Sequence, residues 1–171
     1  QYFNSFTFDD GVGGRFSTTS LVGVVSLGLS YGVDIIDDFL MGARLADDHA
    51  MAETSQNISL SQALVRFHQQ QQYQGLALVP YGEALFHLPS FMGQLICESL
   101  GKSATNDAQR VTTSHAPFLM HGVGPEAQHA FFQQLHQGVD IIPTEFIFSL
   151  PKRDNQCHML KQIIGQMVGL F

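Results

Sequence analysis

The chain has 171 residues, of which 44% are hydrophobic and only 13% are charged, about half of the roughly 25% that is usual for a soluble domain. Its net charge is −7 and its 8 lysines and arginines are scattered, so the sequence lacks the basic stripe that follows a nucleic-acid backbone. The low charged fraction predicts that other protein covers part of this surface, either more of the same polypeptide or a partner subunit.

Cysteine usage and the first residues predict a cytoplasmic protein. Cys97 and Cys157 lie far apart and form no CxxC pair, as expected of a reduced protein. Residues 1–5 lack the basic start and apolar core of a signal peptide, and the interrupted apolar stretch 21–29 is too short to span a bilayer. The chain begins without Met and ends at Phe171 without a tail, so we expect it to be a piece of a longer protein.

The first elements expected are a strand, a turn and a helix. Residues 2–8 are rich in aromatic and β-branched side chains, which favours a short strand. A glycine-rich turn follows over 9–15, and a buried helix of small residues is expected to end near Gly32. The candidate N-caps of this helix are Ser17, Thr18 and Thr19.

The rest of the chain alternates helices with short apolar strands. In chain order, the pattern predicts helices over 34–53 and 57–72, a strand over 75–80, a helix over 83–100 that Pro89 starts or kinks, a polar loop over 103–114, a strand over 117–120, a helix from 124 to 138, a strand over 145–148 and a final helix capped by Asp154 or Asn155. Such alternation is typical of the α/β class, with a parallel sheet covered by helices on both faces. We place a domain boundary after residue 28, so that 1–28 end a preceding α/β domain and 29–171 form most of a second.

Three segments carry residues suited to chemistry. Gly13 and Gly14 precede Arg15, so a ligand could approach the backbone beside a cation, just before a helix N-terminus that favours anions. Gln94 and Glu98 are spaced four apart and share one helix face, with apolar neighbours that would desolvate the carboxylate and make it a better base. The alternatives are an ordinary turn with a surface arginine, and an exposed glutamate near a helix end.

His129 lies among apolar residues of a predicted helix, where a histidine is more often part of the core than of a site. Glu126 precedes it by three residues, but no second such pair accompanies it, so we expect no metal site. His136 is expected to be structural, holding a helix C-terminus by charge or by a hydrogen bond.

Four segments together resemble motifs of one enzyme family. In chain order they are GVGGRFS (11–17), LVPY (78–81), QLICESLGK (94–102), and QHAF with LHQG (128–131 and 135–138). They are similar to the GGR[FY]S, LPY, QxxxES-x-GK and QHxF…LHQG signatures of glucose-6-phosphate isomerases, and they run in family order over nearly the whole chain. The resemblance implies an incomplete α/β domain of the sugar-isomerase (SIS) type that uses neither a metal nor an organic cofactor.

The resemblance also implies a reaction and a role for each residue. Family members interconvert glucose 6-phosphate and fructose 6-phosphate through a cis-enediol(ate), in glycolysis and gluconeogenesis. Glu98 would be the base that moves a proton between C2 and C1, while Arg15 and the backbone of Gly14 would stabilise the enediolate oxygens. Gln94 would position the sugar or its phosphate. His129 would assist ring opening from the neighbouring subunit, which implies a homodimer with a shared active site.

One segment departs from the family pattern. Where the family has EPGTNG before its Gln-His pair, this chain has GVGPEA (122–127), so Pro125 and Glu126 replace Thr and Asn near His129. The family's serine- and threonine-rich phosphate loop and its C-terminal segment with a catalytic lysine are expected outside these residues, so the 171 residues alone are expected to be inactive. A non-catalytic sugar-phosphate sensor of the same fold stays open as an alternative, although the presence of both Arg15 and Glu98 favours an enzyme. A fusion to another sugar-phosphate enzyme also stays open.

Overall fold

The computed structural model describes residues 4–149 and 157–170. The chain forms two compact units, Gln1–Val65 and Arg66–Phe171, which we describe one at a time. The domain boundary expected after residue 28 stays a prediction. Within the described ranges, none of the helices has the length and apolar character needed to cross a membrane.

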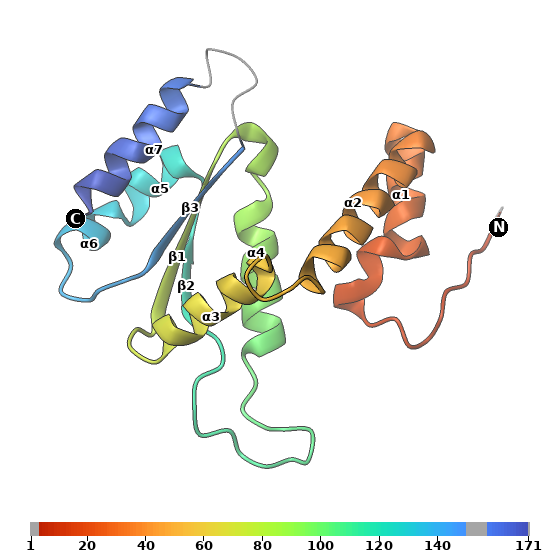
Figure 1. Ribbon diagram of the computed structural model, residues 1–171, viewed down its shortest axis with the longest axis horizontal. Coiled ribbons are helices and arrows are strands. Elements are labelled where there is room, and N and C mark those ends of the chain that lie inside the picture. Colours follow the sequence, from red (N-terminus) through yellow and green to blue (C-terminus); the bar gives the residue numbers. More distant parts are fainter. Residues whose placement is uncertain (1–3, 150–156, 171) are drawn as a thin grey trace. The chain divides into compact units, whose positions relative to one another are not determined.

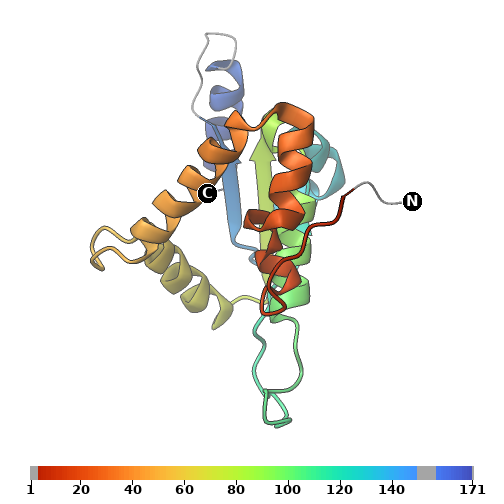
Figure 2. The ribbon, with the colours of Figure 1, turned by 90° about the vertical axis from the view of Figure 1, so that its right-hand side faces the viewer.

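The first unit is built from short and long helices (Figures 1 and 2). The 3-10 helix η1 (Gly14–Thr19) leads into α1 (Leu21–Tyr31), which packs beside α2 (Asp34–Ala50). The strand expected over 2–8 is wrong for the described part of that range, because residues 4–8 have no regular structure. The expected caps of the first helix are also wrong. They lie inside η1, and Ser20 caps α1 instead, its Oγ accepting the Val22 N–H at 3.3 Å.

A buried asparagine links the end of α2 to α3 (Ile58–Gln70). Asn57 is 7% exposed; its side-chain amide donates to the Ala50 carbonyl at 2.7 Å, and its Oδ1 accepts the Leu60 N–H at 2.8 Å. The same side chain therefore caps the N-terminus of α3 and satisfies a free carbonyl at the end of α2. The helices predicted over 34–53 and 57–72 are confirmed.

The second unit holds a parallel sheet of three strands in the order β2-β1-β3. The strands are β1 (Gly75–Tyr81), β2 (Phe118–His121) and β3 (Thr144–Phe148), and both neighbours pair with β1 in parallel register. Every β1 residue after Gly75 is buried, as its continuous apolar run predicts for a strand covered on both faces. The predicted α/β class is confirmed.

Pro80 lies in the central strand, where a missing N–H usually costs a ladder hydrogen bond. Here no ladder hydrogen bond is lost, because the pairing between β1 and β2 ends before Pro80. The Ala77 N–H donates to the Pro143 carbonyl on the β3 side at 2.8 Å, so alternate residues such as Pro80 point their backbone groups to the β2 side. On that side the β2 pairing ends at His121, opposite Leu78, and the proline therefore lies beyond the last rung.

Helices cover both faces of the sheet (Figure 1). On one face Leu76 and Leu78 pack against Ile96 of α4 (Leu88–Leu100). On the other face Val79 and Tyr81 join a larger cluster with residues of α5 (Gly124–Ala130), α6 (Phe132–Gln137) and α7 (Cys157–Gly169), namely Ala127, Phe132 and Ile163. Alternate residues of one strand thus build two separate cores.

Two predicted helices are interrupted. The helix expected over 83–100 consists of the 3-10 helix η2 (Glu83–Leu85) and α4, with Pro89 in the first turn of α4, where proline is tolerated. The helix expected from 124 to 138 breaks at Phe131, whose φ of −137° and ψ of 1° leave the helical region. In an unbroken helix, the side chains of consecutive residues point about 100° apart. Because the helix breaks at Phe131, both Phe131 and Phe132 can pack in the same cluster. The proposed caps of the last helix, Asp154 and Asn155, lie outside the described residues.

Gly124 is expected to tolerate substitution poorly. A Cβ at this position would lie 2.2 to 2.4 Å from ring carbons of Tyr81, a side chain that is 0% exposed. We expect Gly124→Ala to lower the free energy of unfolding by ~1–3 kcal/mol through overpacking, measured by urea unfolding. The control is Gly165→Ala in α7, where a Cβ would meet none of the described atoms within 4 Å and helix propensity should raise stability slightly. Equal stability of the two variants would contradict this prediction.

Candidate functional site

The glycine-rich turn exposes a stretch of backbone. The Phe16 N–H donates to the Gly13 carbonyl at 3.0 Å, and Ser17 Oγ donates to the Gly14 carbonyl at 2.7 Å, which fixes the start of η1. A Cβ at Gly13 or Gly14 would meet none of the described atoms within 4 Å beyond the chain neighbours. Arg15 is exposed on the same turn. A ligand can therefore reach both the backbone and the guanidinium, as the sequence predicts.

The helix N-terminus expected directly after Arg15 lies further along the chain. The 3-10 helix η1 occupies residues 14–19, and α1 begins only at Leu21. The positive end of the α1 dipole is thus separated from Arg15 by the rest of η1. Attraction of an anion to this turn would come from the guanidinium and the open backbone rather than from the end of a long helix.

Gln94 and Glu98 meet on one face of α4, as their spacing predicts. Gln94 Nε2 donates to Glu98 Oε2 at 3.1 Å, and both residues are exposed. The helix ends within a turn, where the Gly101 N–H donates to the Cys97 carbonyl at 2.9 Å and Lys102 Nζ donates to the Glu98 carbonyl. The amide holds the carboxylate in one orientation at the end of a rigid helix.

The apolar shielding expected for Glu98 is not provided by Ile96 or Leu100. Ile96 is buried against the sheet, because it lies about 200° around the helix from Glu98. Leu100 is itself 46% exposed. In its immediate surroundings, the carboxylate therefore matches the alternative of an exposed glutamate near a helix end.

His129 is exposed on α5, so the alternative of a core histidine is wrong. The inner side of this helix is formed by Ala127, which is 1% exposed, and by Gln128, whose Nε2 donates to Tyr81 Oη at 3.1 Å. One position further along, His129 points away from the sheet. Its imidazole is open to another molecule.

The sheet separates Glu98 from His129. Glu98 belongs to α4, which packs on the Leu76 and Leu78 side of β1, whereas His129 belongs to α5, which packs on the Val79 side. Figure 1 shows the two helices on opposite faces of the strands. Within the second unit, the structure therefore brings Gln94 and Glu98 together but keeps His129 apart from them.

His136 holds a helix C-terminus, as expected, but that helix is α7 and not α6, to which His136 belongs. Its Nδ1 lies 3.1 Å from the carbonyl oxygen of Gly169, the last residue of α7, and so the ring satisfies a C-terminal carbonyl. Among the described residues, no three His, Cys, Asp or Glu side chains gather as metal ligands would.

A groove at the carboxyl ends of the strands was not predicted from the sequence. It has a volume of about 510 Å³ and is lined by Tyr81, Gly82, Glu83, Phe86, Val123, Pro125, His158, Met159 and Gln162. Ligands of open α/β sheets commonly bind at this edge. The available signal was the LVPY segment, which marks the end of β1 and the position of Tyr81.

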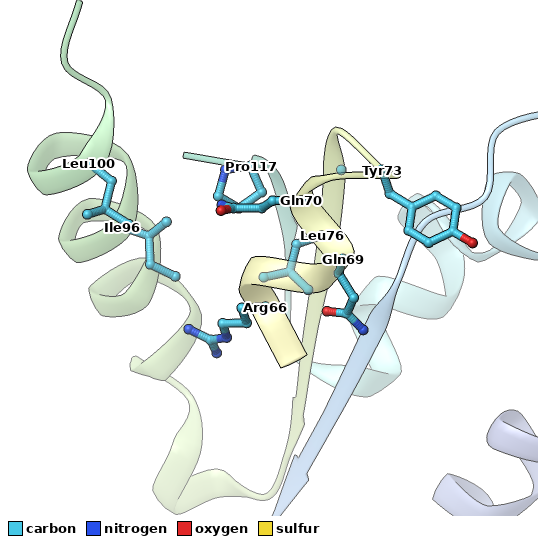
Figure 3. A pocket seen from close by; sticks show the side chains of 9 residues that line it. Arg66, Gln69, Gln70, Tyr73, Leu76, Ile96, Leu100 and Pro117 are labelled. Atoms are coloured by element: carbon cyan, nitrogen blue, oxygen red, sulfur yellow. The ribbon is translucent and has the colours of Figure 1, made fainter. Parts of the chain in front are cut away.

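A smaller cavity lies at the opposite, amino end of β1 (Figure 3). Its volume is about 50 Å³, and Leu76, Ile96 and Leu100 form its apolar wall. Arg66, at its rim, is held by Glu145 of β3 through two hydrogen bonds, from Nε to Oε1 at 3.0 Å and from Nη2 to Oε2 at 2.7 Å. This paired arginine ties the end of α3 to the sheet, which indicates a structural role.

Tyr81 is expected to make stability fall at high pH. Burial raises the pKa of its phenol above the ordinary 10.0, and the hydrogen bond from Gln128 lowers it by less. The folded state thus favours the neutral phenol. The contribution of Tyr81 to the free energy of unfolding is therefore complete below about pH 10, and it is lost as pH rises through the pKa of the folded state. In urea unfolding, Tyr81→Phe should lose less stability above about pH 10 than the wild type does, while Tyr73→Phe should follow the wild type. Parallel pH profiles for wild type and Tyr81→Phe would contradict the prediction.

Comparisons with known proteins agree on one family. Residues 2–168 match the family described as phosphoglucose isomerase. A glucose-6-phosphate isomerase of Chlamydia muridarum is 38% identical over 150 residues, covering 86% of this chain and 29% of that protein. One from Desulfotalea psychrophila is 36% identical over 183 residues, covering 99% of this chain and 34% of that protein.

Solved structures give the same result. A glucose-6-phosphate isomerase of Chlamydia trachomatis aligns with a TM-score of 0.83 and 32% identity, over 96% of this chain and 34% of its own. A hypothetical protein from Thermus thermophilus aligns with a TM-score of 0.66 and 27% identity, over 94% of this chain and 42% of its own.

The covered parallel sheet, together with an alignment over 96% of the chain, defines an α/β domain that is similar to part of a glucose-6-phosphate isomerase. The chain belongs to the phosphoglucose isomerase family. It spans 29% of the length of the Chlamydia muridarum relative and 34% of the Desulfotalea psychrophila relative.

Proposed function

We propose that the complete polypeptide carrying this chain is a glucose-6-phosphate isomerase, which interconverts glucose 6-phosphate and fructose 6-phosphate in glycolysis and gluconeogenesis. The observation that carries the proposal is the Gln94–Glu98 pair, an exposed carboxylate held at 3.1 Å by an amide on a rigid helix, in a chain whose relatives bear this activity in their names.

The proposed chemistry is a proton transfer that needs neither a metal nor an organic cofactor. The carboxylate of Glu98 takes the proton from C2 of the open-chain aldose, leaving a cis-enediolate whose negative charge starts on O1. A proton then moves from O2 to O1, and the protonated Glu98 returns its proton to C1 as the carbonyl of the ketose forms at C2. The negative charge that develops on the enediolate oxygens would be stabilised by the guanidinium of Arg15 and the backbone at Gly14. Open backbone at Gly14 supports this role, because only a glycine leaves room for an oxygen to approach so closely.

The roles differ in their expected weight. General base catalysis contributes ~10²–10⁴-fold, and a preorganised group that stabilises developing charge contributes ~10²–10³-fold. Loss of Glu98 or Arg15 should therefore be more damaging than loss of Gln94, which positions the sugar or its phosphate and orients the carboxylate.

A homodimer with shared active sites is part of the proposal. The proposal is supported by the position of the sheet, which lies between α4 and α5. One chain cannot present Glu98 and His129 to the same substrate from opposite faces of a sheet, so the two groups of one site would come from two chains. His129, exposed on α5, would reach the site of the neighbouring subunit and assist ring opening as an acid or base. The Pro125-Glu126 start of α5 precedes it by one turn and sets its position.

Exposed apolar side chains support extensive contacts with other protein. Leu29 is 86% exposed, Tyr31 77%, Val33 73% and Met51 87%. Three of these four lie within residues 29–33, and grouped exposed apolar side chains mark sites of contact with other protein. The low charged fraction of the sequence gives the same indication. We infer that other parts of the polypeptide, or the partner subunit, cover these positions in a cytoplasmic enzyme.

The test is turnover together with binding, on the complete polypeptide. Conversion of fructose 6-phosphate to glucose 6-phosphate is measured by a coupled assay, and binding of fructose 6-phosphate by calorimetry. Binding with turnover supports the isomerase. Binding without turnover would favour the non-catalytic sugar-phosphate sensor, and the absence of both would reject a sugar-phosphate site.

A further inference from the structure

Both basic residues of the first 65 positions line the same groove. The lysines and arginines of this stretch are Arg15 and Arg44, and both border a groove of about 490 Å³ in the first unit. The acidic residues of the same stretch are Asp9, Asp10, Asp34, Asp37, Asp38, Asp47, Asp48 and Glu53. Of these, Asp47 alone lines the groove. The positive charge of an otherwise acidic unit is therefore concentrated at one place.

Two elements form the walls of this groove. One wall is η1, which contributes Arg15, Phe16, Thr18 and Thr19. The other is a single stripe of α2, formed by Leu40, Ala43, Arg44 and Asp47. These four positions are spaced i, i+3, i+4 and i+7, so they lie along one face of the helix. Arg44 thus faces the groove from a rigid element opposite the turn that carries Arg15.

The lining favours a small anion. Two guanidinium groups and one carboxylate leave one net positive charge, and the two threonine hydroxyls add neutral donors. Guanidinium groups bind phosphate and carboxylate oxygens through paired hydrogen bonds. Ligand pockets typically enclose about 300–1,000 Å³, and the volume of this groove falls within that range.

We propose that Arg44 is a second cationic residue of the substrate site, which binds an anionic oxygen of the sugar phosphate and positions the substrate against Arg15. This assignment rests on the proposed function for the identity of the ligand, and on the groove itself for the binding of an anion. Arg44 belongs to none of the four motifs that identify the family, so sequence motifs give it no role.

The expected effect is on binding rather than on chemistry. Arg44 would hold the substrate equally in the ground state and in the transition state, so its loss raises KM and leaves kcat nearly unchanged. Loss of a hydrogen bond to a charged group weakens the affinity for the ligand by ~10- to 100-fold. Arg44→Gln keeps most of the aliphatic stem on α2 and removes the charge, whereas Arg44→Lys keeps the charge and loses the fork, and should restore most of the affinity.

The experiment has a kinetic arm and a binding arm, both on the complete polypeptide. We expect Arg44→Gln to raise KM for fructose 6-phosphate about tenfold or more with kcat within about threefold of wild type, and to weaken inorganic phosphate binding in calorimetry by a similar factor. Arg110→Gln, which removes an exposed arginine of the 101–117 loop, is the matched control and should leave both constants unchanged. Circular dichroism and Arg44→Lys check that the fold is intact.

The two arms separate this inference from the proposed function. Arg44→Gln with both KM and the phosphate Kd within about twofold of wild type overturns the role of Arg44, while wild-type turnover would still support the isomerase. A wild type without turnover rejects the proposed function, and the phosphate arm then still decides whether Arg44 binds an anion. An equal loss of affinity in Arg110→Gln would also overturn the proposal, because the effect would then be general electrostatics.

Discussion

Replacement of Glu98 by glutamine is expected to lower kcat for isomerisation by ~10²–10⁴-fold, the contribution of a general base. The amide has almost the same shape as the carboxylate and can still pair with Gln94, whose Nε2 lies 3.1 Å from Glu98 Oε2. Structure and binding should therefore persist while proton abstraction is lost. Because Glu98 is exposed at the end of α4, the substitution should change the free energy of unfolding very little.

Two measurements make the Glu98 prediction specific. The first is steady-state turnover of fructose 6-phosphate, with Glu53→Gln as a control that changes an exposed glutamate of the first unit. The second is exchange of the C2 hydrogen of glucose 6-phosphate with deuterated solvent, which reports proton transfer directly and should cease in Glu98→Gln. Turnover equal to that of wild type would reject Glu98 as the base. Loss of activity without loss of exchange would assign it a different role.

Mixing two inactive variants is expected to restore activity. Glu98→Gln and His129→Ala should each be inactive alone, since each removes one group from every active site. If a site combines Glu98 of one chain with His129 of the other, a mixed dimer contains one intact site and one doubly altered site. Random exchange of subunits in an equal mixture makes half of the dimers mixed, so activity should recover to about a quarter of the wild-type value.

The mixing experiment depends on the position of the sheet between α4 and α5. If Glu98 and His129 of one chain served the same site, every site of a mixed dimer would lack one group and the mixture would stay inactive. A matched mixture of Glu98→Gln with Arg15→Ala is informative in the same way, because it tests whether those two residues come from one chain. Subunit exchange is verified with differently tagged chains, so that inactivity cannot reflect a failure to mix.

Much of the second unit could be predicted from its sequence. The apolar run of β1 is bounded by turn residues and is too short for a helix, and its complete burial follows from a parallel sheet with two covered faces. Gln94 and Glu98 are spaced i, i+4 within a strongly periodic segment, which was enough to predict their contact. These features depend on local spacing, which one sequence contains.

Other features depend on contacts that no local pattern reveals. The break at Phe131 allows two adjacent rings to join one core cluster, and that benefit exists only once β1 and β3 are in place. The exposure of His129 depends on which side of α5 meets the sheet, and the clue was the small residue Ala127 two positions earlier. Residues 4–8 have the composition of a strand, but the described residues offer them no strand to pair with, and composition alone does not produce a strand.

The position of β1 in the centre of the sheet also determines the order of events during synthesis. Both of its partners lie later in the chain, β2 at Phe118–His121 and β3 at Thr144–Phe148. At ribosomal rates, the most buried strand of the unit therefore waits on the order of several seconds before its last neighbour exists. During that interval Leu76, Leu78 and Val79 can be covered by α4 but not by a complete sheet. We expect the nascent chain to depend on chaperones at this stage, and expression at lower temperature to improve the yield of soluble protein.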